Sequence, residues 1–296
     1  MTITRESVML IGAGRLGSAL ARALHAKGFV IAGIVDRDVS RSRRLVNLFS
    51  AAIALDAVAS IPQCDIIMIA VPDDEIETVV SSLQQQVQSR NPWRFVFHTS
   101  GALTSDILMP LKTWGIAGGS FHPLQTFAGN DDDWKKLSHI YIGIEGDSAA
   151  VQKAIEISQA LNSKAVLVPR EFKMQYHLAC TMASNYLIAL LVPVVEMFRA
   201  MGYAELAALD FLFPLLSTTV ANLHKNGLER ALTGPLLRGD VGTLTKHLQL
   251  LEADFPAYSR LYRQMGEILL GLPSIREKLS EQKYLSIMQM LHDQRT

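Results

Sequence analysis

The sequence predicts an α/β Rossmann domain, with a doubly wound and mostly parallel sheet, followed by an all-α domain. Three observations favour this fold class. Apolar strand-like runs alternate with helical periodicity up to residue 168, a G-x-G-x-x-G turn follows the first run, and only helical periodicity follows Pro169. We therefore expect a dinucleotide-binding domain over residues 1–168 and an all-helical domain over residues 169–296, because a chain of 296 residues has room for both.

The expected elements of the first domain follow one another at the spacing of βαβ units. Strands are expected at residues 8–11, 29–35, 65–71, 94–97, 115–121, 140–144 and 165–168, and helices at 16–25, 40–49, 74–86 and 149–161. In the second domain we expect helices at 171–201 with a bend at Pro193, at 203–226 with a break near Pro214, and at 241–252, 256–270 and 274–290.

Composition narrows the class of protein. Lysine plus arginine and aspartate plus glutamate both number 28, which argues against a binder of nucleic acid or of an anionic membrane and favours a small-molecule substrate. Cys64 and Cys180 are the two cysteines, without the spacing of a disulfide framework or a zinc site, so no metal is expected. Residues 1–8 do not have the form of a signal peptide, and we expect a cytoplasmic protein.

The apolar stretch at residues 178–195 is near the length that spans a bilayer. It contains Asn185 and Pro193, and its polar residues recur on one face. We therefore interpret it as a buried helix at a domain or subunit interface and not as a membrane span.

The turn at residues 12–17, GAGRLG, has both the pattern and the setting of a dinucleotide site. It follows a strand and opens a helix, and Asp36 stands 19 positions after its last glycine. The three glycines would in turn allow a tight turn, a close approach to the pyrophosphate and close packing of helix on strand, while the helix N–H groups would bind the phosphates. We expect NAD or NADP here in preference to a glycine turn without a ligand. The expected contacts are Gly12, Gly14, Arg15, Leu16 and Gly17.

The choice between NAD and NADP stays open. Asp36 ends the second strand, where a carboxylate can accept both ribose hydroxyls of NAD and would repel a 2′-phosphate. Four arginines follow it, and they could pair with that phosphate or form a solvated helix face. They are Arg37, Arg41, Arg43 and Arg44.

Further cofactor contacts are expected where the third strand ends. Ala70, Val71 and Pro72 lie at the carboxyl end of that strand, where the sheet topology places the ligand crevice. The same segment could equally be a plain strand-to-helix turn that Asp73 or Asp74 caps.

Two later strands end in polar clusters that should open onto the same crevice, FHTSG at residues 97–101 and GSFHPLQ at 119–125. His122 is a candidate acid/base and substrate contact, because the ordinary pKa of histidine suits proton transfer near neutrality. His98 or His122 could instead be a strand-end imidazole bonded to the backbone. Ser100 is expected to contact both cofactor and substrate.

A polar stripe marks the first half of the long helix. Lys173, His177, Thr181 and Asn185 fall at i, i+4, i+8 and i+12 and so share one face. The stripe either faces the cofactor cleft or bonds to neighbouring helices. We favour the cleft for His177 and Asn185 and leave Lys173 open between the site and solvent.

The segment 232–240, LTGPLLRGD, is expected to be an irregular connection. Its Arg238 could bind a substrate carboxylate, or could pair with Asp240 and only shape the loop. Asp240 could also cap the helix that follows. On that helix, His247 is more readily explained as a packed or surface residue than as a ligand.

These segments together resemble a bacterial family of oxidoreductases that pair a Rossmann-like N-terminal domain with a C-terminal helical domain of unknown function. The resemblance runs over nearly the whole chain, through the glycine turn, AVPD, HTSGAL, GSFHPLQTF, YHLACTMASN and LTGPLLRGD. More distantly, the chain is similar to the 6-phosphogluconate dehydrogenase superfamily, which includes 3-hydroxyacid dehydrogenases, pyrroline-5-carboxylate reductases and, through His122-Pro123, prephenate dehydrogenases.

The resemblance implies a C-terminal domain like that of 6-phosphogluconate dehydrogenase, a homodimer through this domain, and a pocket between the sheet edge and the long helix. The 3-hydroxyacid branch places a catalytic lysine four residues before an asparagine on this helix. Here Thr181 stands four residues before Asn185, so His177 or His122 would have to supply the proton.

We therefore expect an NAD(P)-dependent oxidoreductase that moves a hydride to or from a small, carboxylate-bearing substrate. His122 or His177 would be the acid/base, Asn185 would orient the substrate, and Ser100 and Arg238 would bind it. The alternatives are a non-catalytic dimeric nucleotide sensor and, among enzymes, an imine reductase of the pyrroline type.

Overall fold

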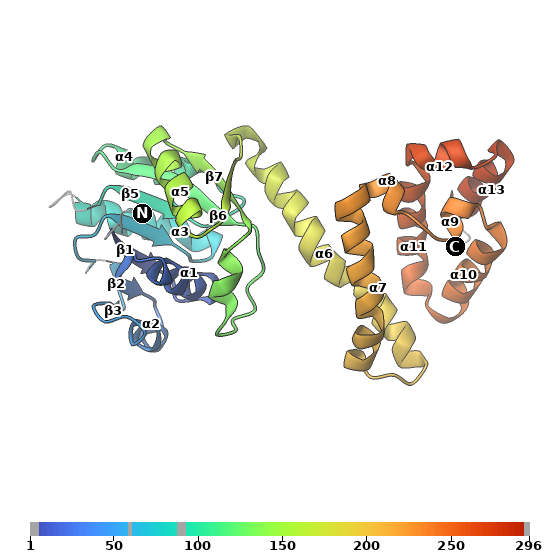
Figure 1. Ribbon diagram of the computed structural model, residues 1–296, viewed down its shortest axis with the longest axis horizontal. Coiled ribbons are helices and arrows are strands. Elements are labelled where there is room, and N and C mark those ends of the chain that lie inside the picture. Colours follow the sequence, from blue (N-terminus) through green and yellow to red (C-terminus); the bar gives the residue numbers. More distant parts are fainter. Residues whose placement is uncertain (1–5, 59–60, 88–92, 293–296) are drawn as a thin grey trace. The chain divides into compact units, whose positions relative to one another are not determined.

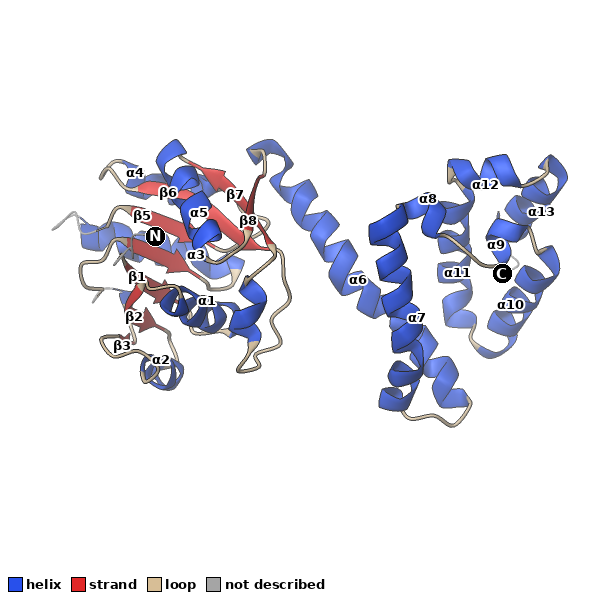
Figure 2. Cartoon of the chain, in the orientation of Figure 1, coloured by secondary structure: helices blue, strands red, loops and turns tan. Residues whose placement is uncertain are grey.

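The computed structural model describes residues 6–58, 61–87 and 93–292. The first part of the chain forms a sheet with helices on both faces (Figures 1 and 2), and its strand order is β3-β2-β1-β4-β5-β6-β7-β8. Neighbouring strands are parallel except for β6 and β7, which are antiparallel. The predicted doubly wound, mostly parallel sheet is therefore confirmed.

The predicted strands and helices of this part are all present, with ends shifted by a few residues. The three-residue strand β3 was missed, because so short a segment shows no periodicity. The strands are β1 (Ser7–Ile11), β2 (Val30–Val35), β3 (Ile53–Leu55), β4 (Ile66–Ile69), β5 (Phe95–His98), β6 (Ala117–Pro123), β7 (Tyr141–Gly146) and β8 (Lys164–Leu167). The α-helices are α1 (Arg15–Ala26), α2 (Val39–Val46), α3 (Asp73–Val87), α4 (Met109–Lys112) and α5 (Ser148–Ala160), and η2 (Ser105–Leu108) and η3 (Asp133–Leu137) are short 3-10 helices.

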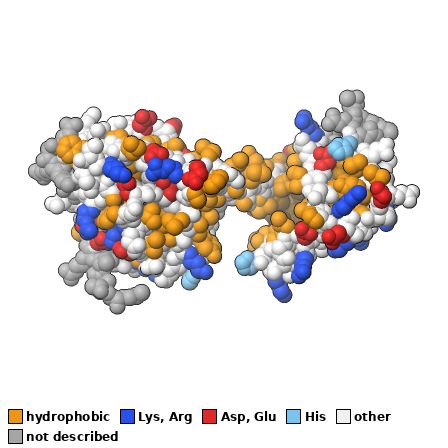
Figure 3. Space-filling model, turned by 90° about the horizontal axis from the view of Figure 1, so that it is seen from above, with side chains coloured by type: hydrophobic (Ala, Val, Ile, Leu, Met, Phe, Trp, Pro, Cys, Tyr) orange, Lys and Arg blue, Asp and Glu red, His pale blue; other side chains and the backbone are white. Residues whose placement is uncertain are grey.

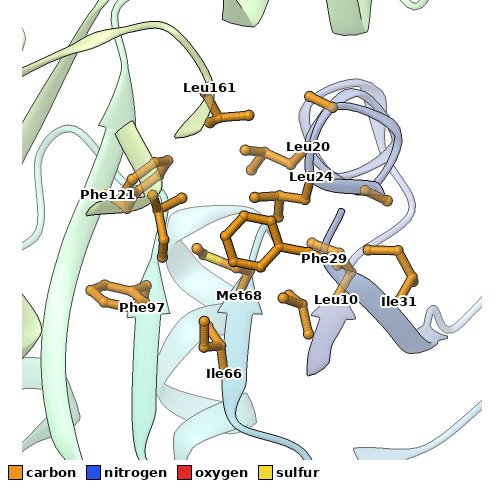
Figure 4. Close-up of a cluster of buried hydrophobic side chains, with 14 of the residues drawn as sticks. Leu10, Leu20, Leu24, Phe29, Ile31, Ile66, Met68, Phe97, Phe121 and Leu161 are labelled. Atoms are coloured by element: carbon orange, nitrogen blue, oxygen red, sulfur yellow. The ribbon is translucent and has the colours of Figure 1, made fainter. Parts of the chain in front are cut away.

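The core lies on both faces of the sheet, because successive strand residues point to opposite sides. Leu10 of β1 packs in a cluster with side chains of α1 and α5, which Figure 4 shows around Leu20 and Leu24. Met9 and Ile11 of the same strand pack on the other side, with α3 and α4. Burial on both faces explains why the strands read as continuous apolar runs in the sequence.

The rest of the described chain is helical, as predicted. After the 3-10 turn η4 (Arg170–Phe172) come α6 (Lys173–Ala200), α7 (Glu205–Asn226), α8 (Leu228–Ala231), α9 (Pro235–Arg238), α10 (Val241–Asp254), α11 (Pro256–Leu270), α12 (Pro273–Lys278) and α13 (Glu281–His292). The segment expected to be an irregular connection thus contains one helical turn, α9. Asp240 caps α10 as predicted, accepting from the Thr243 N–H at 3.1 Å and from its hydroxyl at 2.8 Å.

Two helix predictions were wrong. The predicted break near Pro214 is absent, because α7 continues through this proline, which costs a helix only one backbone hydrogen bond and a local steric adjustment. The single helix predicted at 274–290 is divided into α12 and α13. Leu279 lies between them in extended backbone and buries its side chain against Ile275, so core packing overrides helical propensity there.

The chain divides into two compact units, Met1–Asn185 and Tyr186–Thr296. The first unit contains the sheet and the first half of α6. The second contains the remaining helices around a core of its own, built from residues such as Leu244 and Ile287. A domain boundary at residue 168, where strands give way to helices, stays a prediction.

Long apolar helices stand out in the described chain. Residues 170–200 and 205–226 are long and apolar enough to cross a membrane, by length and composition alone. Figure 3 shows hydrophobic side chains gathered along α6, and Leu178, Met182 and Ile188 are exposed. These side chains are exposed in the single chain, so the predicted burial of residues 178–195 at a domain or subunit interface stays a prediction.

Candidate active site

The glycine turn prepares an anion site at the start of α1. Gly12 has a φ of 104° and packs against the Ala70 carbonyl so closely that no Cβ would fit. Gly14 is the N-cap of α1, no side chain caps the helix, and the space beside its Cα is open. The first-turn N–H groups are thus left to a ligand, and the helix terminus favours a negative one.

Asp36 ties the end of β2 to this turn. Its Oδ2 accepts from the Ala13 N–H at 2.7 Å and its Oδ1 accepts from the Asp38 N–H at 2.8 Å. Each carboxylate oxygen has a second acceptor position, so both stay able to bind a ribose hydroxyl. Asp36 therefore supports the turn and can also face the adenosine ribose.

The four arginines after β2 are exposed. Arg37 forms an ion pair with Glu75 at 3.0 Å, and Arg41 forms one with Asp38 at 3.3 Å. Both pairs lie in solvent, where they are weak and easily exchanged for a phosphate. The choice between NAD and NADP accordingly stays open.

Most of the predicted cofactor contacts line one cavity, but Arg15, Leu16, Gly17 and Ser100 do not. A cavity of about 930 Å³ is lined by residues of the glycine turn and of the ends of β2 and β4. Its volume is near the upper end of the roughly 300–1,000 Å³ that is typical of ligand sites. A second hollow of about 560 Å³ shares Gly14 and Arg41 with it and is lined by Arg15 and Arg44. The predicted residues on the first cavity are Gly12, Gly14, Asp36, Arg37, Ala70, Val71 and Pro72.

Ser100 lies outside both hollows and is almost fully buried. Its hydroxyl donates to Asp73 at 2.7 Å and accepts from the N–H groups of Ala102 and Leu103 at 3.1 and 3.0 Å. Because its donor is already used, Ser100 holds the turn after β5 in the observed arrangement. Its direct contact with cofactor or substrate stays a prediction.

The structure brings His122 and His177 together. Nδ1 of His122 lies 2.8 Å from the hydroxyl of Tyr176, and the two imidazole rings are 6.1 Å apart between centroids. A Cβ on Gly101 would lie 2.8 Å from Nε2 of His122 and 2.6 Å from Nδ1 of His177. Nδ1 of His177 is buried and has no hydrogen-bond partner among the described residues. Gly101 thus allows two imidazole nitrogens to converge above the turn that follows β5.

Lys173, which the sequence left open, is one of the most buried side chains of the described chain. It is 1% exposed, and its Nζ donates to the hydroxyl of Ser120 at 2.5 Å. Burial lowers its pKa to about 8, although Glu145 and Asp73 oppose this change. The interpretation of Lys173 as a solvated residue is therefore wrong.

Burial also lowers the pKa of the two histidines at the strand ends, His98 and His122. It lowers the pKa of His122 to about 4, and the charges of Lys173 and His177 act in the same direction. His98 is fully buried, and burial followed by the Lys173 charge lowers its pKa to about 3, against the backbone of Thr104. Both rings are neutral at pH 7, so the ordinary histidine pKa assumed from the sequence does not apply.

The two remaining predicted site residues, Asn185 and Arg238, are both exposed in the described structure. Asn185 is exposed and follows His177 by eight residues, about 12 Å along the helix. Arg238 is exposed at the end of α9 in the second unit and makes no ion pair with Asp240 in the described structure. Their roles in orienting and binding substrate stay predictions.

The sequence did not indicate the contact of Tyr176 with His122 or the burial of Lys173. Tyr176 precedes His177 in the chain and so lies off the i, i+4 stripe, although a helix of 3.6 residues per turn places it over Lys173 as well. Lys173 follows the charged residues Arg170 and Glu171 in the sequence, which gave no sign that its ammonium would be buried. Neither position belongs to a nucleotide motif.

Two domain profiles match the chain. A Rossmann-like domain matches residues 1–123, and a domain of unknown function, DUF2520, matches residues 140–268, so that the second match begins within the last strands of the sheet. No curated protein matches the chain. The predicted pairing of a Rossmann-like domain with a C-terminal domain of unknown function is confirmed.

Solved structures resemble the chain over most of its length. A "putative NADP oxidoreductase" from Bacteroides fragilis is 25% identical, with a TM-score of 0.73, and the match covers 90% of this chain and 99% of that one. A protein from Thermotoga maritima is 26% identical, with a TM-score of 0.69 and coverage of 88% and 96%. An imine reductase from Myxococcus stipitatus in complex with NADP+ is 18% identical and shares the fold, with a TM-score of 0.61 and coverage of 96% and 99%.

Proposed function

We propose that this chain, which joins a Rossmann-like domain to a DUF2520 domain, is an NAD(P)-dependent oxidoreductase acting on a small, carboxylate-bearing substrate. The uncapped start of α1 carries the proposal, because it opens onto the same cavity as Asp36 and the Ala70 turn. This arrangement offers amides to a diphosphate and a carboxylate to a ribose. The similarity to a protein named as an NADP oxidoreductase supports it.

In this proposal NAD(P)H, when bound, supplies a hydride from its nicotinamide ring. His122 and His177 stand at the carboxyl edge of the sheet and are the candidates for holding the substrate and moving the accompanying proton. The unpaired Nδ1 of His177 is available to a substrate, and Nε2 of His122 points away from Tyr176. Asn185 and Arg238 remain the proposed orienting and carboxylate-binding residues.

Nucleotide binding is the first test of the proposal, and Gly14→Asp is the variant designed to block it. The φ of −70° and the open space at Gly14 admit an aspartate, whose carboxylate would cap the α1 N–H groups that a phosphate needs. We expect NADH or NADPH to bind the wild-type protein and to lose about 100-fold in affinity in the variant, with thermal stability unchanged or raised. Fluorescence titration measures both nucleotides.

Failure of both nucleotides to bind at millimolar concentration would refute the proposal. Turnover is tested separately, by following NADPH oxidation with cyclic imines and 2-oxo acids, the first class chosen because an imine reductase shares the fold. Binding without turnover of any substrate class, unaffected by His122→Ala and His177→Ala, would support a nucleotide sensor instead of an enzyme.

We further propose that the chain forms a homodimer through α6 and α7 and works in the cytoplasm. The exposed side chains of Met182, Ile188 and Phe211 belong to a larger apolar surface than a soluble monomer ordinarily leaves in water. A second copy would bury it, and the two free thiols suit a reducing compartment.

The oligomeric state tests the dimer. Light scattering of the purified chain in buffer without detergent should give twice the mass of one chain, and Ile188→Glu should shift the equilibrium to monomer. The exposed Leu48 on the Rossmann unit provides the matched control, because Leu48→Glu should leave the mass unchanged. A wild-type protein that requires detergent would contradict the proposal and favour a membrane location for these helices.

A further inference from the structure

Two polar contacts, one turn of helix apart, join the start of α6 to the end of β6. Lys173 donates to Ser120 at 2.5 Å, and Tyr176 contacts His122 at 2.8 Å. Lys173 and Tyr176 are one helical turn apart, and Ser120 and His122 are two residues apart on one side of the strand. The ammonium lies 6.0 Å from the centre of the Tyr176 ring. The packing of α6 on β6 therefore sets the positions of both the Lys173 ammonium and the His122 imidazole.

The ammonium of Lys173 is buried without an ion pair to any described carboxylate. The two carboxylates whose charges raise the pKa of Lys173, Asp73 and Glu145, accept hydrogen bonds from other residues. Asp73 accepts from Ser100 at 2.7 Å, and Glu145 accepts from the N–H and hydroxyl of Ser105 at 2.5 and 3.0 Å. Arg170 lies 3.8 Å from Glu145 and neutralises it further. The lysine charge thus acts on its surroundings largely uncancelled.

His122 likewise has no carboxylate to stabilise a positive ring. Its hydrogen-bond partner is a phenol, whose pKa is raised by burial, so that it stays uncharged. Glu145 and Asp73 face Lys173 and are engaged by Ser105 and Ser100. The other titratable groups around the ring are Lys173 and His177 from α6 and His98 from β5.

We propose that Lys173 is a positioning residue of the site, whose buried charge acts together with the burial of His122 to keep that ring uncharged, while Tyr176 holds the orientation of the ring. The proposal deepens the proposed oxidoreductase and rests on it for its catalytic meaning. It assigns His122 the part of a neutral imidazole, which can donate or accept a hydrogen bond at Nε2 but brings no positive charge to the substrate. A buried ammonium repels a second positive charge far more strongly than a solvated one does.

The ring charge can be measured directly by NMR on the full chain labelled with 13C at histidine Cε1. The chain has eight histidines, and the signal of His122 is assigned as the one lost in His122→Gln. In the wild type we expect this signal to stay at its neutral position down to about pH 5. In Lys173→Met its midpoint should rise by about one unit or more, and Lys173→Arg should restore the low midpoint.

Lys164→Met is the matched control, because Lys164 is an exposed lysine on β8 and its removal should leave the midpoint unchanged. Lys173→Gln is a second variant should Lys173→Met not fold, since it also removes the charge while leaving an amide that can contact Ser120, and it should also raise the midpoint. A wild-type midpoint near the ordinary 6.5 would overturn the proposal without any variant. An unchanged midpoint in Lys173→Met or Lys173→Gln would overturn it as well.

None of these titrations uses a nucleotide, so their outcome is independent of the nucleotide-binding test. If the protein binds NADPH but His122 titrates as a free histidine, the positioning role alone fails. If His122 stays neutral under the control of Lys173 and no nucleotide binds, the proposed oxidoreductase fails while the electrostatic relationship stands.

Discussion

The hydroxyl of Tyr176 lies 2.8 Å from Nδ1 of His122, and the two rings meet nearly edge to face, at 86°. This contact joins the start of α6 to the end of β6, across 54 positions of sequence. Because it engages one imidazole nitrogen, Nε2 is the nitrogen of His122 left for a substrate. The orientation of a candidate acid/base thus depends on a tyrosine outside any nucleotide motif.

Tyr176→Phe removes this contact while keeping the ring. We expect the free energy of unfolding to fall by about 1 kcal/mol, the net value of one hydrogen bond, and turnover to fall roughly tenfold, because His122 loses its fixed orientation. Nucleotide affinity should not change, since the glycine turn is untouched. Tyr141→Phe, at an exposed tyrosine of β7, serves as the control. A loss of nucleotide affinity in Tyr176→Phe would contradict this assignment.

Gly101→Ala inserts a methyl group between the two imidazoles. The new Cβ would lie 2.6 Å from Nδ1 of His177 and 2.8 Å from Nε2 of His122, so at least one ring must move. We expect a destabilisation of about 1–3 kcal/mol in chemical denaturation and a strong loss of turnover. Gly242→Ala in α10 meets no atom closer than 3.9 Å and should be neutral or slightly stabilising. Equal stabilities of the two variants would show that the rings are not held as described.

Most of the fold was predictable because it depends on local patterns. Buried parallel strands give apolar runs, and the turn of Gly12 carries its own signature, so the sheet and the cofactor cavity could be found from residues close in sequence. The failures lie where packing overrides local preference. Leu279 ends a helix because its side chain is needed in the core, and α7 continues through Pro214.

The candidate site was less predictable, because its chemistry depends on contacts between distant segments. Residue types alone indicated His122 and His177, but not that burial would lower the pKa of His122 to about 4. That change depends on how α6 lies on β6 and on the buried charge of Lys173. A pattern of polar residues shows which side chains share a helix face, and not how much water reaches them.

Asp36→Ala tests the support of the glycine turn. It removes the acceptor of the Ala13 and Asp38 N–H groups, and with it the carboxylate proposed to bind the ribose. We expect affinity for NADH to fall by about tenfold or more, and affinity for NADPH to fall less, because the carboxylate also repels a 2′-phosphate. Asp56→Ala removes a carboxylate from the same cavity and should change both affinities little. Equal losses for NADH and NADPH would assign Asp36 a purely structural part.

The stability of the fold should fall in mild acid because of the buried histidines. Above about pH 6.5 His122 is neutral in both the folded and the unfolded chain, so its full contribution is present. As the pH falls from there toward the folded pKa of about 4, His122 takes up a proton in the unfolded chain but stays neutral in the folded chain. The free energy of unfolding therefore decreases. His98, with a pKa of about 3, adds to the same trend.

Urea unfolding at pH 7 and pH 5 measures this loss in the wild type and in His122→Gln. Because glutamine does not titrate, the variant should lose roughly 2 kcal/mol less than the wild type between the two pH values. His25→Gln, at an exposed position of α1 in the Rossmann unit, is the matched control. If His122→Gln loses as much as the control, His122 takes up its proton equally readily in the folded chain, and neither burial nor Lys173 holds it neutral.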